Sequence, residues 1–141
     1  MAMTMHVDIV SAEEEIFSGT ANMLVAPAEM GEVGILPRHA PLIARLKPGE
    51  VRVQVEGQED QYFFVSGGLL EVQPHVVTVL ADTAVRARDL DEAQALEAKR
   101  RAEEALQNRQ SEFEEAKALA DLAEAAAQLR LLEKIRKRGL K

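Results

Sequence analysis

The sequence is poor in the residues that form disulfides, thiolate sites and aromatic platforms. Among its 141 residues there is no cysteine and no tryptophan, and the aromatic side chains are one tyrosine and four phenylalanines. Without cysteine the chain has neither a disulfide framework nor a thiolate nucleophile or metal ligand. With so few rings, no platform for stacking unpaired bases is visible, and the core must be filled mainly by Val, Leu and Ile.

Long apolar runs are absent as well. The longest are only a few residues, far below the roughly 20 that cross a bilayer as a helix, and residues 1–15 lack the basic and apolar regions of a signal peptide. We therefore expect a soluble protein that is not exported. The net charge of −7 argues against a general nucleic-acid-binding protein, because such proteins need a basic surface to displace counterions from phosphates.

The residues that usually mark catalytic and metal sites form no recognisable group. His6, His39 and His75 are scattered, and none has a second ligand at metal spacing. The segment Ser66-Gly67-Gly68 lacks the Gly-x-Ser-x-Gly frame and the paired histidine of a nucleophile turn, and a turn between two strands explains it. No Gly-x-x-x-x-Gly-Lys loop is present to hold phosphates. The sequence thus predicts no metal site, no cofactor and no catalytic residue.

The hydrophobic pattern changes between Arg88 and Asp89. Ahead of this point apolar residues alternate every second position, as in residues 51–56 (VRVQVE), which is typical of a half-buried strand. Further candidate strands, separated by turn-forming glycine and proline, lie at residues 5–10, 22–27, 42–46, 61–66, 69–73 and 76–81. Many short strands at close spacing favour a sandwich. For residues 1–88 we predict a β-sandwich in the form of a flattened barrel of about ten short strands.

From Asp89 onward the chain is rich in Ala, Leu, Glu, Lys and Arg and contains no proline. Asp89 with Glu92, and Ser111 with Glu114, match the capping-box pattern and predict two helix starts. Apolar stripes are expected at Ala95, Ala98, Ala102 and Ala105 on the first helix, and at Leu119, Leu122, Ala126 and Leu129 on the second. Residues 89–141 are therefore predicted to form an antiparallel two-helix hairpin.

The predicted hairpin combines a weak seam with a cationic end. Burying an alanine methyl group stabilises far less than burying a leucine side chain, at roughly 25 cal/mol per Å², whereas alanine has the highest helix propensity and keeps each helix intact when the pair opens. Residues 129–141 carry six basic side chains and only Glu133 as an acid, although residues 1–88 carry 12 acidic and 6 basic ones. The pattern predicts an arm that folds down or reaches out. Its positive end suits the helix C-terminal dipole, and its excess charge favours an acidic partner.

A second candidate contact surface is the segment of residues 31–41 (GEVGILPRHAP). It places two glycines, two prolines and three charged or titratable side chains within eleven residues, and we expect it to be a loop. A loop of this composition is equally compatible with a costly turn and with a contact surface.

A series of short segments matches, in order, the pattern of one known family. The segments are Asp8-Ile9-Val10-Ser11-Ala12-Glu13, Phe17-Ser18-Gly19, Gly34-Ile35-Leu36-Pro37, His39-Ala40-Pro41-Leu42, Lys47-Pro48-Gly49, Ser66-Gly67-Gly68, Leu70-Glu71-Val72-Gln73-Pro74, Val77-Thr78-Val79-Leu80-Ala81-Asp82-Thr83 and Ala127-Gln128-Leu129-Arg130. Together they are highly specific. On these residues the chain resembles, along its whole length, the epsilon subunits of bacterial F-type ATP synthases.

The resemblance implies a noncatalytic central-stalk subunit, peripheral on the cytoplasmic side of the bacterial plasma membrane and not inserted into it. The β-sandwich would bind the gamma subunit and the rotating c-ring, and the hairpin would inhibit ATP hydrolysis by the alpha and beta subunits. The contacts implied are Glu29, Glu32, Arg38 and His39 toward the c-ring, Ser11 toward gamma, and Arg130, Lys134, Arg136, Lys137 and Arg138 toward acidic loops of the catalytic subunits.

Some members of this family bind ATP through a motif of Ile or Leu, Asp, two variable residues, Arg and Ala at the start of the first helix. Here the segment reads Leu90-Asp91-Glu92-Ala93-Gln94-Ala95, so Leu90, Asp91 and Ala95 match and Gln94 stands where the arginine belongs. A neutral amide does not replace a guanidinium against a triphosphate. We therefore expect weak or absent ATP binding.

A different class of function is compatible with the same two-part design. The chain would then be a free-standing nucleotide-sensing or adaptor module. Stoichiometric co-purification with gamma separates a synthase subunit from such a module. An enzyme in its own right is the least favoured class, because the motifs assemble no nucleophile, no paired acid and base, and no metal site.

Overall fold

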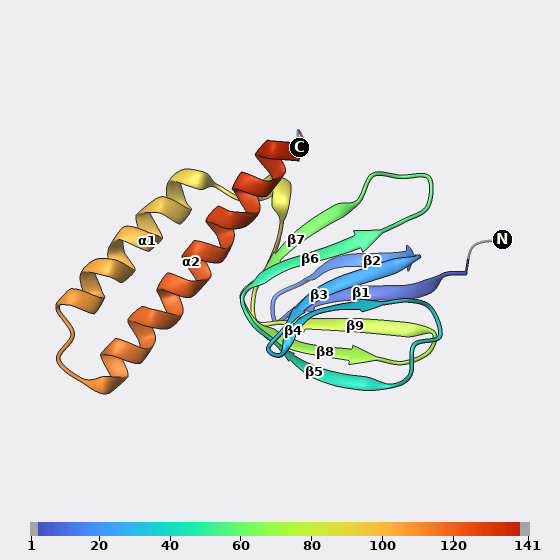
Figure 1. The fold of residues 1–141 in the computed structure, drawn as a ribbon, viewed down its shortest axis with the longest axis horizontal. Coiled ribbons are helices and arrows are strands. Elements are labelled where there is room, and N and C mark those ends of the chain that lie inside the picture. The colour runs from blue at the N-terminus through green and yellow to red at the C-terminus, as the bar shows by residue number, and fades with distance from the viewer. Residues whose placement is uncertain (1–2, 139–141) are drawn as a thin grey trace. The chain divides into compact units, whose positions relative to one another are not determined.

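The structure is a computed structural model that describes residues 3–138, and it divides into two compact units between Ala87 and Arg88. The division lies one residue before the change in sequence pattern, within a short 3-10 turn at Ala87–Asp89 (η1). Figure 1 shows the strands of the first unit and the paired helices of the second. Across residues 3–138, no helix combines the length and apolar character that crossing a bilayer demands. Lys141, part of the basic end of the sequence, lies outside the described residues.

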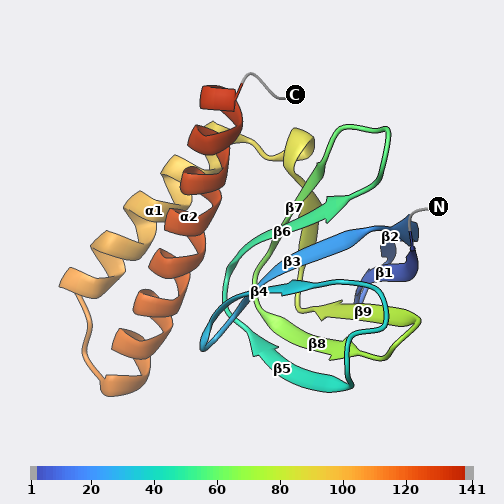
Figure 2. The same cartoon turned by 45° about the vertical axis from the view of Figure 1, so that its right-hand side comes forward.

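The first unit is a single sheet that curls on itself into a flattened barrel, as predicted (Figure 2). Ten strands occur among its described residues. They are β1 (Met5–Ser11), β2 (Glu15–Ala21), β3 (Met23–Ala28), β4 (Gly31–Ile35), β5 (Leu42–Leu46), β6 (Gly49–Gln54), β7 (Gln61–Val65), β8 (Gly68–Val72), β9 (Val76–Ala81) and β10 (Ala84–Arg86). The strand order is β10-β7-β6-β3-β5-β8-β9-β1-β2, with β4 paired to β3.

The core of this unit follows the period of two that the sequence shows. On β1 the side chains of Met5, Val7 and Ile9 are buried, and the residues between them are only partly covered. Aliphatic side chains dominate the core cluster, as the composition predicts, and the principal aromatic contact is between Phe17 and Phe63, whose ring centroids lie 5.6 Å apart edge to face. Because β1 pairs in parallel with β9 and antiparallel with β2, it ties the early and late parts of the unit together.

The expectation of a loop over residues 31–41 is wrong for its first half. Residues 31–35 form β4, which pairs with β3 from Leu24↔Ile35 to Ala28↔Gly31. Glycine is depleted in strands, so the presence of Gly31 and Gly34 favoured the prediction of a loop. In the folded protein, pairing with β3 overrides that local preference. The turn proper is limited to the residues between β4 and β5, where Arg38 has a φ of 68°. Two further strands, β2 and β10, were not among the candidate strands.

The second unit is the predicted antiparallel hairpin of α1 (Glu92–Gln107) and α2 (Glu112–Arg138). The predicted start of α2 is confirmed: the Glu114 N–H donates to the Ser111 Oγ at 3.1 Å, and the Gln110 N–H donates to the Glu114 carboxylate at 2.6 Å. The predicted start of α1 is wrong by two residues. The N-cap is Asp91, because the η1 turn occupies Asp89.

The apolar seam of the hairpin agrees with the prediction on α1 and is shifted on α2. On α1, Ala95 and Ala102 are buried, whereas Ala98 is partly exposed and Ala105 is exposed. On α2 the buried residues are Ala118, Ala125, Ala127 and Leu131. Ala118 and Ala125 each lie one position before the predicted Leu119 and Ala126, and Leu119 is exposed. The smaller side chain takes the seam position, which lets two alanine-rich helices approach closely. The buried apolar area is correspondingly small.

Two glycines of the sheet allow the effect of the close approach of β8 to β9 to be separated from the effect of backbone strain. Gly31 and Gly68 have φ values of 131° and 137°, but a Cβ on Gly68 would lie 2.1 Å from the Leu80 carbonyl oxygen, whereas a Cβ on Gly31 would meet nothing within 4 Å. We expect Gly31→Ala to lower the free energy of unfolding by about 1–3 kcal/mol through backbone strain alone. Gly68→Ala should cost on the order of 4 kcal/mol or more, because the backbone of β9 must move.

Urea unfolding of the two variants measures this difference. Equal losses would show that the close approach of β8 to β9 does not limit the sheet.

Candidate functional site

The β-unit contains one serine, histidine and aspartate cluster, on its outer face. The Ser18 hydroxyl donates to the Asp8 Oδ1 at 2.7 Å, and the His6 Nε2 lies 2.9 Å from the same oxygen and 3.2 Å from the Ser18 Oγ. In a catalytic triad the imidazole lies between serine and carboxylate and uses one ring nitrogen for each. Here one nitrogen meets both, and the hydroxyl proton points to Asp8. The cluster therefore links β1 to β2 and is not arranged to activate a nucleophile. The sequence did not reveal it, because only the pairing of β1 with β2 brings Asp8 opposite Ser18.

No group of three or more His, Asp or Glu side chains able to hold a metal ion occurs in the described part of the chain. The remaining candidate sites are surfaces that could contact a partner protein. They are the two turns that flank β4, the outer face of the sheet and the two ends of the hairpin.

The turn between β3 and β4 presents an apolar side chain between two acids. Glu29 and Met30 form its tip, with Met30 97% exposed, and Glu32 is exposed on β4. The tip is fixed by its backbone: the Glu29 N–H donates to the Arg45 carbonyl at 2.9 Å, and Gly31 supplies the positive φ that the turn requires. Because the backbone is held, the exposed side chains are presented in a defined place.

Arg38 and His39 lie at the opposite end of β4 from this tip. The Arg38 N–H donates to the Pro74 carbonyl at 2.8 Å, which anchors its turn beside the β8–β9 turn, and the His39 N–H donates to the Leu36 carbonyl at 3.1 Å. Five residues of strand separate the two turns, about 14 Å from first to last Cα at about 3.4 Å per residue. The structure thus brings Glu29 together with Glu32, and Arg38 together with His39, but it does not bring the two pairs together.

Ser11 lies at the end of β1, opposite Ala81 of β9. These strand ends are the ones nearer to Glu29. Ala81 pairs with Gly68, Gly68 pairs with Leu46 of β5, and Leu46 pairs with Ala28, the residue before Glu29. The Ser11 hydroxyl is used within its own turn, where it accepts the N–H groups of Glu13 and Glu14 at 3.4 and 3.3 Å. Any contact that Ser11 makes with a partner must therefore accommodate this turn.

An apolar patch on the outer face of β5, β8 and β9 was missed by the sequence analysis. Leu69 and Leu80 are directly paired across β8 and β9 and are 42% and 45% exposed. Ile43 on the neighbouring β5 is 72% exposed and is a diagonal neighbour of Leu69, because Ile43 pairs with Glu71 and Leu69 pairs with Arg45. Each of these residues is unremarkable alone. The strand register gathers them on one face, beside Val10 of β1, which is opposite Leu80. A signal was present in the sequence, since apolar residues occupy outward positions of the alternation in three strands.

The cationic end of the hairpin is partly paired within the chain. Arg136 forms an ion pair with Glu92 in the first turn of α1, and Lys137 Nζ lies 3.2 Å from Glu133 on its own helix. Arg130 is exposed, and Lys134 and Arg138 belong to the last turns of the same helix. The five predicted residues therefore all lie in the last turns of α2, because they fall within nine consecutive residues of this helix.

The residues of the ATP-binding pattern serve the start of α1. The Asp91 Oδ1 accepts the N–H groups of Ala93 and Gln94 at 2.9 and 3.3 Å, Ala95 is buried, and Leu90 is partly buried. The carboxylate of the pattern is therefore occupied as a helix cap. A groove of about 430 Å³ between the helices has an alanine floor and a rim of both charge signs, including Arg101, Lys117, Asp121 and Glu124. A rim of mixed sign does not select a polyanion.

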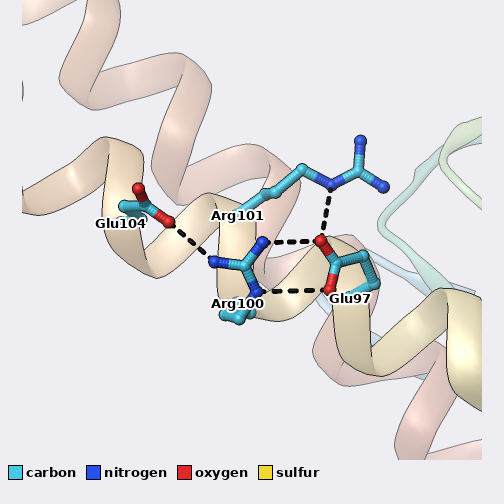
Figure 3. Close-up of polar contacts among 4 residues, drawn as sticks. All are labelled: Glu97, Arg100, Arg101 and Glu104. Atoms are coloured by element: carbon cyan, nitrogen blue, oxygen red, sulfur yellow. Dashed lines mark hydrogen bonds and ion pairs between the residues drawn. The ribbon is translucent and has the colours of Figure 1, made fainter.

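A charged cluster on the exposed face of α1 stabilises this helix locally (Figure 3). The Arg100 guanidinium lies 2.6 Å from Glu97 and 2.8 Å from Glu104, and the Arg101 Nε lies 3.6 Å from Glu97. The hydrogen bond from Arg100 lowers the pKa of Glu97, and the same bond raises the pKa of Arg100. Because all four side chains are exposed, solvent screens the cluster, and its contribution to stability is small.

The fold and both units correspond to one family. The beta-sandwich domain of the ATP synthase Delta/Epsilon chain matches residues 4–87, and its long alpha-helix domain matches residues 88–133. The ATP synthase epsilon chain of Nitrosococcus oceani is 75% identical over 139 residues, which are 98% of this chain and 99% of that one. That of Thioalkalivibrio sulfidiphilus is 72% identical over 97% of this chain and 98% of its own length. The chain therefore belongs to the ATP synthase delta/epsilon family, among the epsilon chains.

Solved structures share the fold at low sequence identity. A chain of the Euglena gracilis mitochondrial ATP synthase (OSCP/F1/c-ring) superposes with a TM-score of 0.82 at 21% identity, over 92% of this chain and 81% of that one. A chain of the Tetrahymena thermophila mitochondrial ATP synthase central stalk and c-ring gives a TM-score of 0.67 at 12% identity, over 92% and 97% of the two chains.

The Glu97–Arg100 pair predicts a pH dependence with a definite sign. The folded pKa of Glu97 lies below its unfolded value, so the contribution of the pair is fully present above the unfolded pKa and is lost as the pH falls through the folded pKa. We expect Arg100→Gln to raise the pKa of Glu97, seen in an NMR titration of its carboxyl group. The stability difference between this variant and the wild type should shrink below about pH 4.

Lys99→Gln removes the same charge from the same helix and serves as the control. If the pKa of Glu97 lies equally far below its usual value in the wild type and in both variants, the assignment of the shift to Arg100 is contradicted.

Proposed function

We propose that the chain is a noncatalytic subunit of the central stalk of a proton-translocating ATP synthase, peripheral on the cytoplasmic side of the bacterial plasma membrane. In this proposal the β-unit couples the catalytic head to the c-ring, and the hairpin restrains ATP hydrolysis. The observation that carries it is the division into two compact units, each of which matches one domain of the family and offers its own contact surfaces.

Two surfaces of the β-unit support the coupling role. The apolar patch of Ile43, Leu69 and Leu80 is suited to a lasting contact with gamma, because covering it removes apolar area from water. Ser11 lies at the edge beside it. The tip formed by Glu29 and Met30 is suited to a contact with the polar loops of the c-ring.

A c-ring contact through all four proposed residues would extend along the whole of β4. A contact confined to one turn would involve Glu29 and Glu32 alone, and Arg38 and His39 would then face another part of the stalk. The fixed backbone of both turns favours a rigid coupling in either case.

The hairpin supports the inhibitory role through its length, its seam and its charge. Its second helix has 27 residues and extends about 40 Å at 1.5 Å per residue. The alanine seam resists opening only weakly, so the folded and extended arms can differ by a few kcal/mol. Once extended, Arg130, Lys134 and the basic end at Arg136, Lys137 and Arg138 would meet acidic loops of the catalytic subunits.

Truncation after Arg88 tests the inhibitory role. We expect complexes assembled with the truncated chain to retain gamma in stoichiometric amount and to hydrolyse ATP several-fold faster, because the arm is gone. A full-length chain carrying Arg136→Gln, Lys137→Gln and Arg138→Gln keeps both helices and removes three of the five proposed cationic contacts, and we expect it to reproduce most of the activation. High salt should mimic part of it, since salt screens exposed charges.

Unchanged hydrolysis by the truncated complex would remove the inhibitory role and leave the β-unit as the working part. Failure of the full-length chain to co-purify with gamma would favour the free-standing nucleotide-sensing or adaptor module.

ATP binding by the isolated chain is expected to be weak or absent. The motif arginine is replaced by Gln94, and the Asp91 carboxylate is engaged as a helix cap. We expect calorimetry to detect no micromolar affinity for the wild type, and Gln94→Arg to increase binding. Micromolar binding by the wild type would overturn this prediction.

A further inference from the structure

The two ends of the hairpin are held by different kinds of contact. At the bend, the Arg109 guanidinium donates to the Leu106 carbonyl at 2.6 Å and lies 3.4 Å from Glu115, and the capping box of Ser111 and Glu114 fixes the entry into α2. These contacts join residues that are close in sequence, so they survive when the helices separate. The bend is therefore a stable joint and not the part that decides whether the hairpin is closed.

At the open end, a contact joins residues 44 positions apart. Arg136 in the last turn of α2 donates to the carboxylate of Glu92 in the first turn of α1. This pair breaks whenever the helices separate. Its two members also suit their helix ends, because an acid is favoured at a helix N-terminus and a base at a C-terminus.

Arg136 has two alternative acidic partners in this account. Arg136 belongs to the basic end that the proposed function directs toward an acidic surface of the catalytic subunits. In the closed hairpin Glu92 already supplies a carboxylate to this guanidinium. An acidic partner and Glu92 therefore compete for the same side chain.

We propose that Glu92 and Arg136 form a releasable clasp that sets how often the hairpin is closed, and that an acidic surface opens the hairpin by taking Arg136 from Glu92. The effect on ATP hydrolysis rests on the proposed function, whereas the closure of the hairpin does not. Both side chains are about half exposed or more, so the clasp is modest and shifts the ratio of open to closed forms by about two- to five-fold. A shift of this size changes how often the hairpin is closed, because the alanine seam adds little to the free energy of closing.

The closure is tested in the isolated full-length chain with spin labels. The chain has no cysteine, so Glu103→Cys on α1 and Ala123→Cys on α2, both exposed, provide unique attachment points. At a temperature where both separations are populated, pulsed electron resonance should show the open fraction rising about two- to five-fold in Glu92→Gln and in Arg136→Gln. The double variant should show no further rise, and the exchange of the two residues, Glu92→Arg with Arg136→Glu, should restore closure.

Glu133→Gln is the matched control, because it removes an ion pair of α2 to Lys137 that does not reach α1. We expect it to leave the open fraction unchanged. Equal opening by Glu133→Gln, or additive effects of Glu92→Gln and Arg136→Gln in the double variant, would overturn the clasp.

The assembled complex separates the clasp from the inhibitory contact. Both single variants open the hairpin, but only Glu92→Gln keeps the arginine that meets the acidic surface, so Glu92→Gln should deepen inhibition of ATP hydrolysis and Arg136→Gln should relieve it. If truncation after Arg88 fails to raise hydrolysis, the proposed inhibitory role of the hairpin fails, and the distance measurement still decides the clasp. If truncation activates the complex but Glu92→Gln leaves inhibition unchanged, the clasp does not regulate the arm and the inference is overturned.

Discussion

The alanine seam between α1 and α2 is the contact on which the behaviour of the second unit depends. Ala95 and Ala102 on one helix and Ala118 and Ala125 on the other bury little apolar area, so closing the hairpin gains little free energy. Each helix nevertheless remains a helix on its own account, because alanine favours helix and each start is capped by an oxygen-bearing side chain. With the seam this weak, the proposed clasp gives exposed charges, which would be negligible in a well-packed protein, control over the closed state.

The β-unit is built on the opposite principle. Its core is a continuous cluster of buried aliphatic side chains, and its edges are fixed by backbone contacts that leave no alternative. Gly68 lies so close to the Leu80 carbonyl that no side chain fits, and the Ser66 hydroxyl accepts the N–H of Thr83 at 2.9 Å while the Ser66 N–H donates back to the Thr83 carbonyl at 3.0 Å. In the proposed function one unit transmits force and the other changes its state, and both properties would originate in the side chains that fill each interior.

The sequence predicted what depends on local pattern and failed where long-range register decides. Alternating valines gave the sheet, and the Ser111–Glu114 capping box gave the start of α2. Composition hid β4, because its glycines disfavour a strand until β3 supplies a partner. The grouping of Glu29 with Arg38 as c-ring contacts came from the family resemblance and stays a prediction, and the structure adds that β4 places them at opposite ends. The apolar patch around Leu69 and Leu80, and the pairing of Glu92 with Arg136, arise from neighbours far apart in the chain, which no periodicity reports.

The central claim is that the hairpin must open for the arm to inhibit. The most direct test is to lock it closed in the assembled complex with a short, reducible cross-linker between cysteines at Ala98 and Gln128, which line the same groove between the helices. The account predicts that the locked complex hydrolyses ATP as fast as one with the truncated chain, and that reduction of the cross-linker in the same sample restores inhibition. Hydrolysis that stays inhibited while the cross-linker is intact would contradict it.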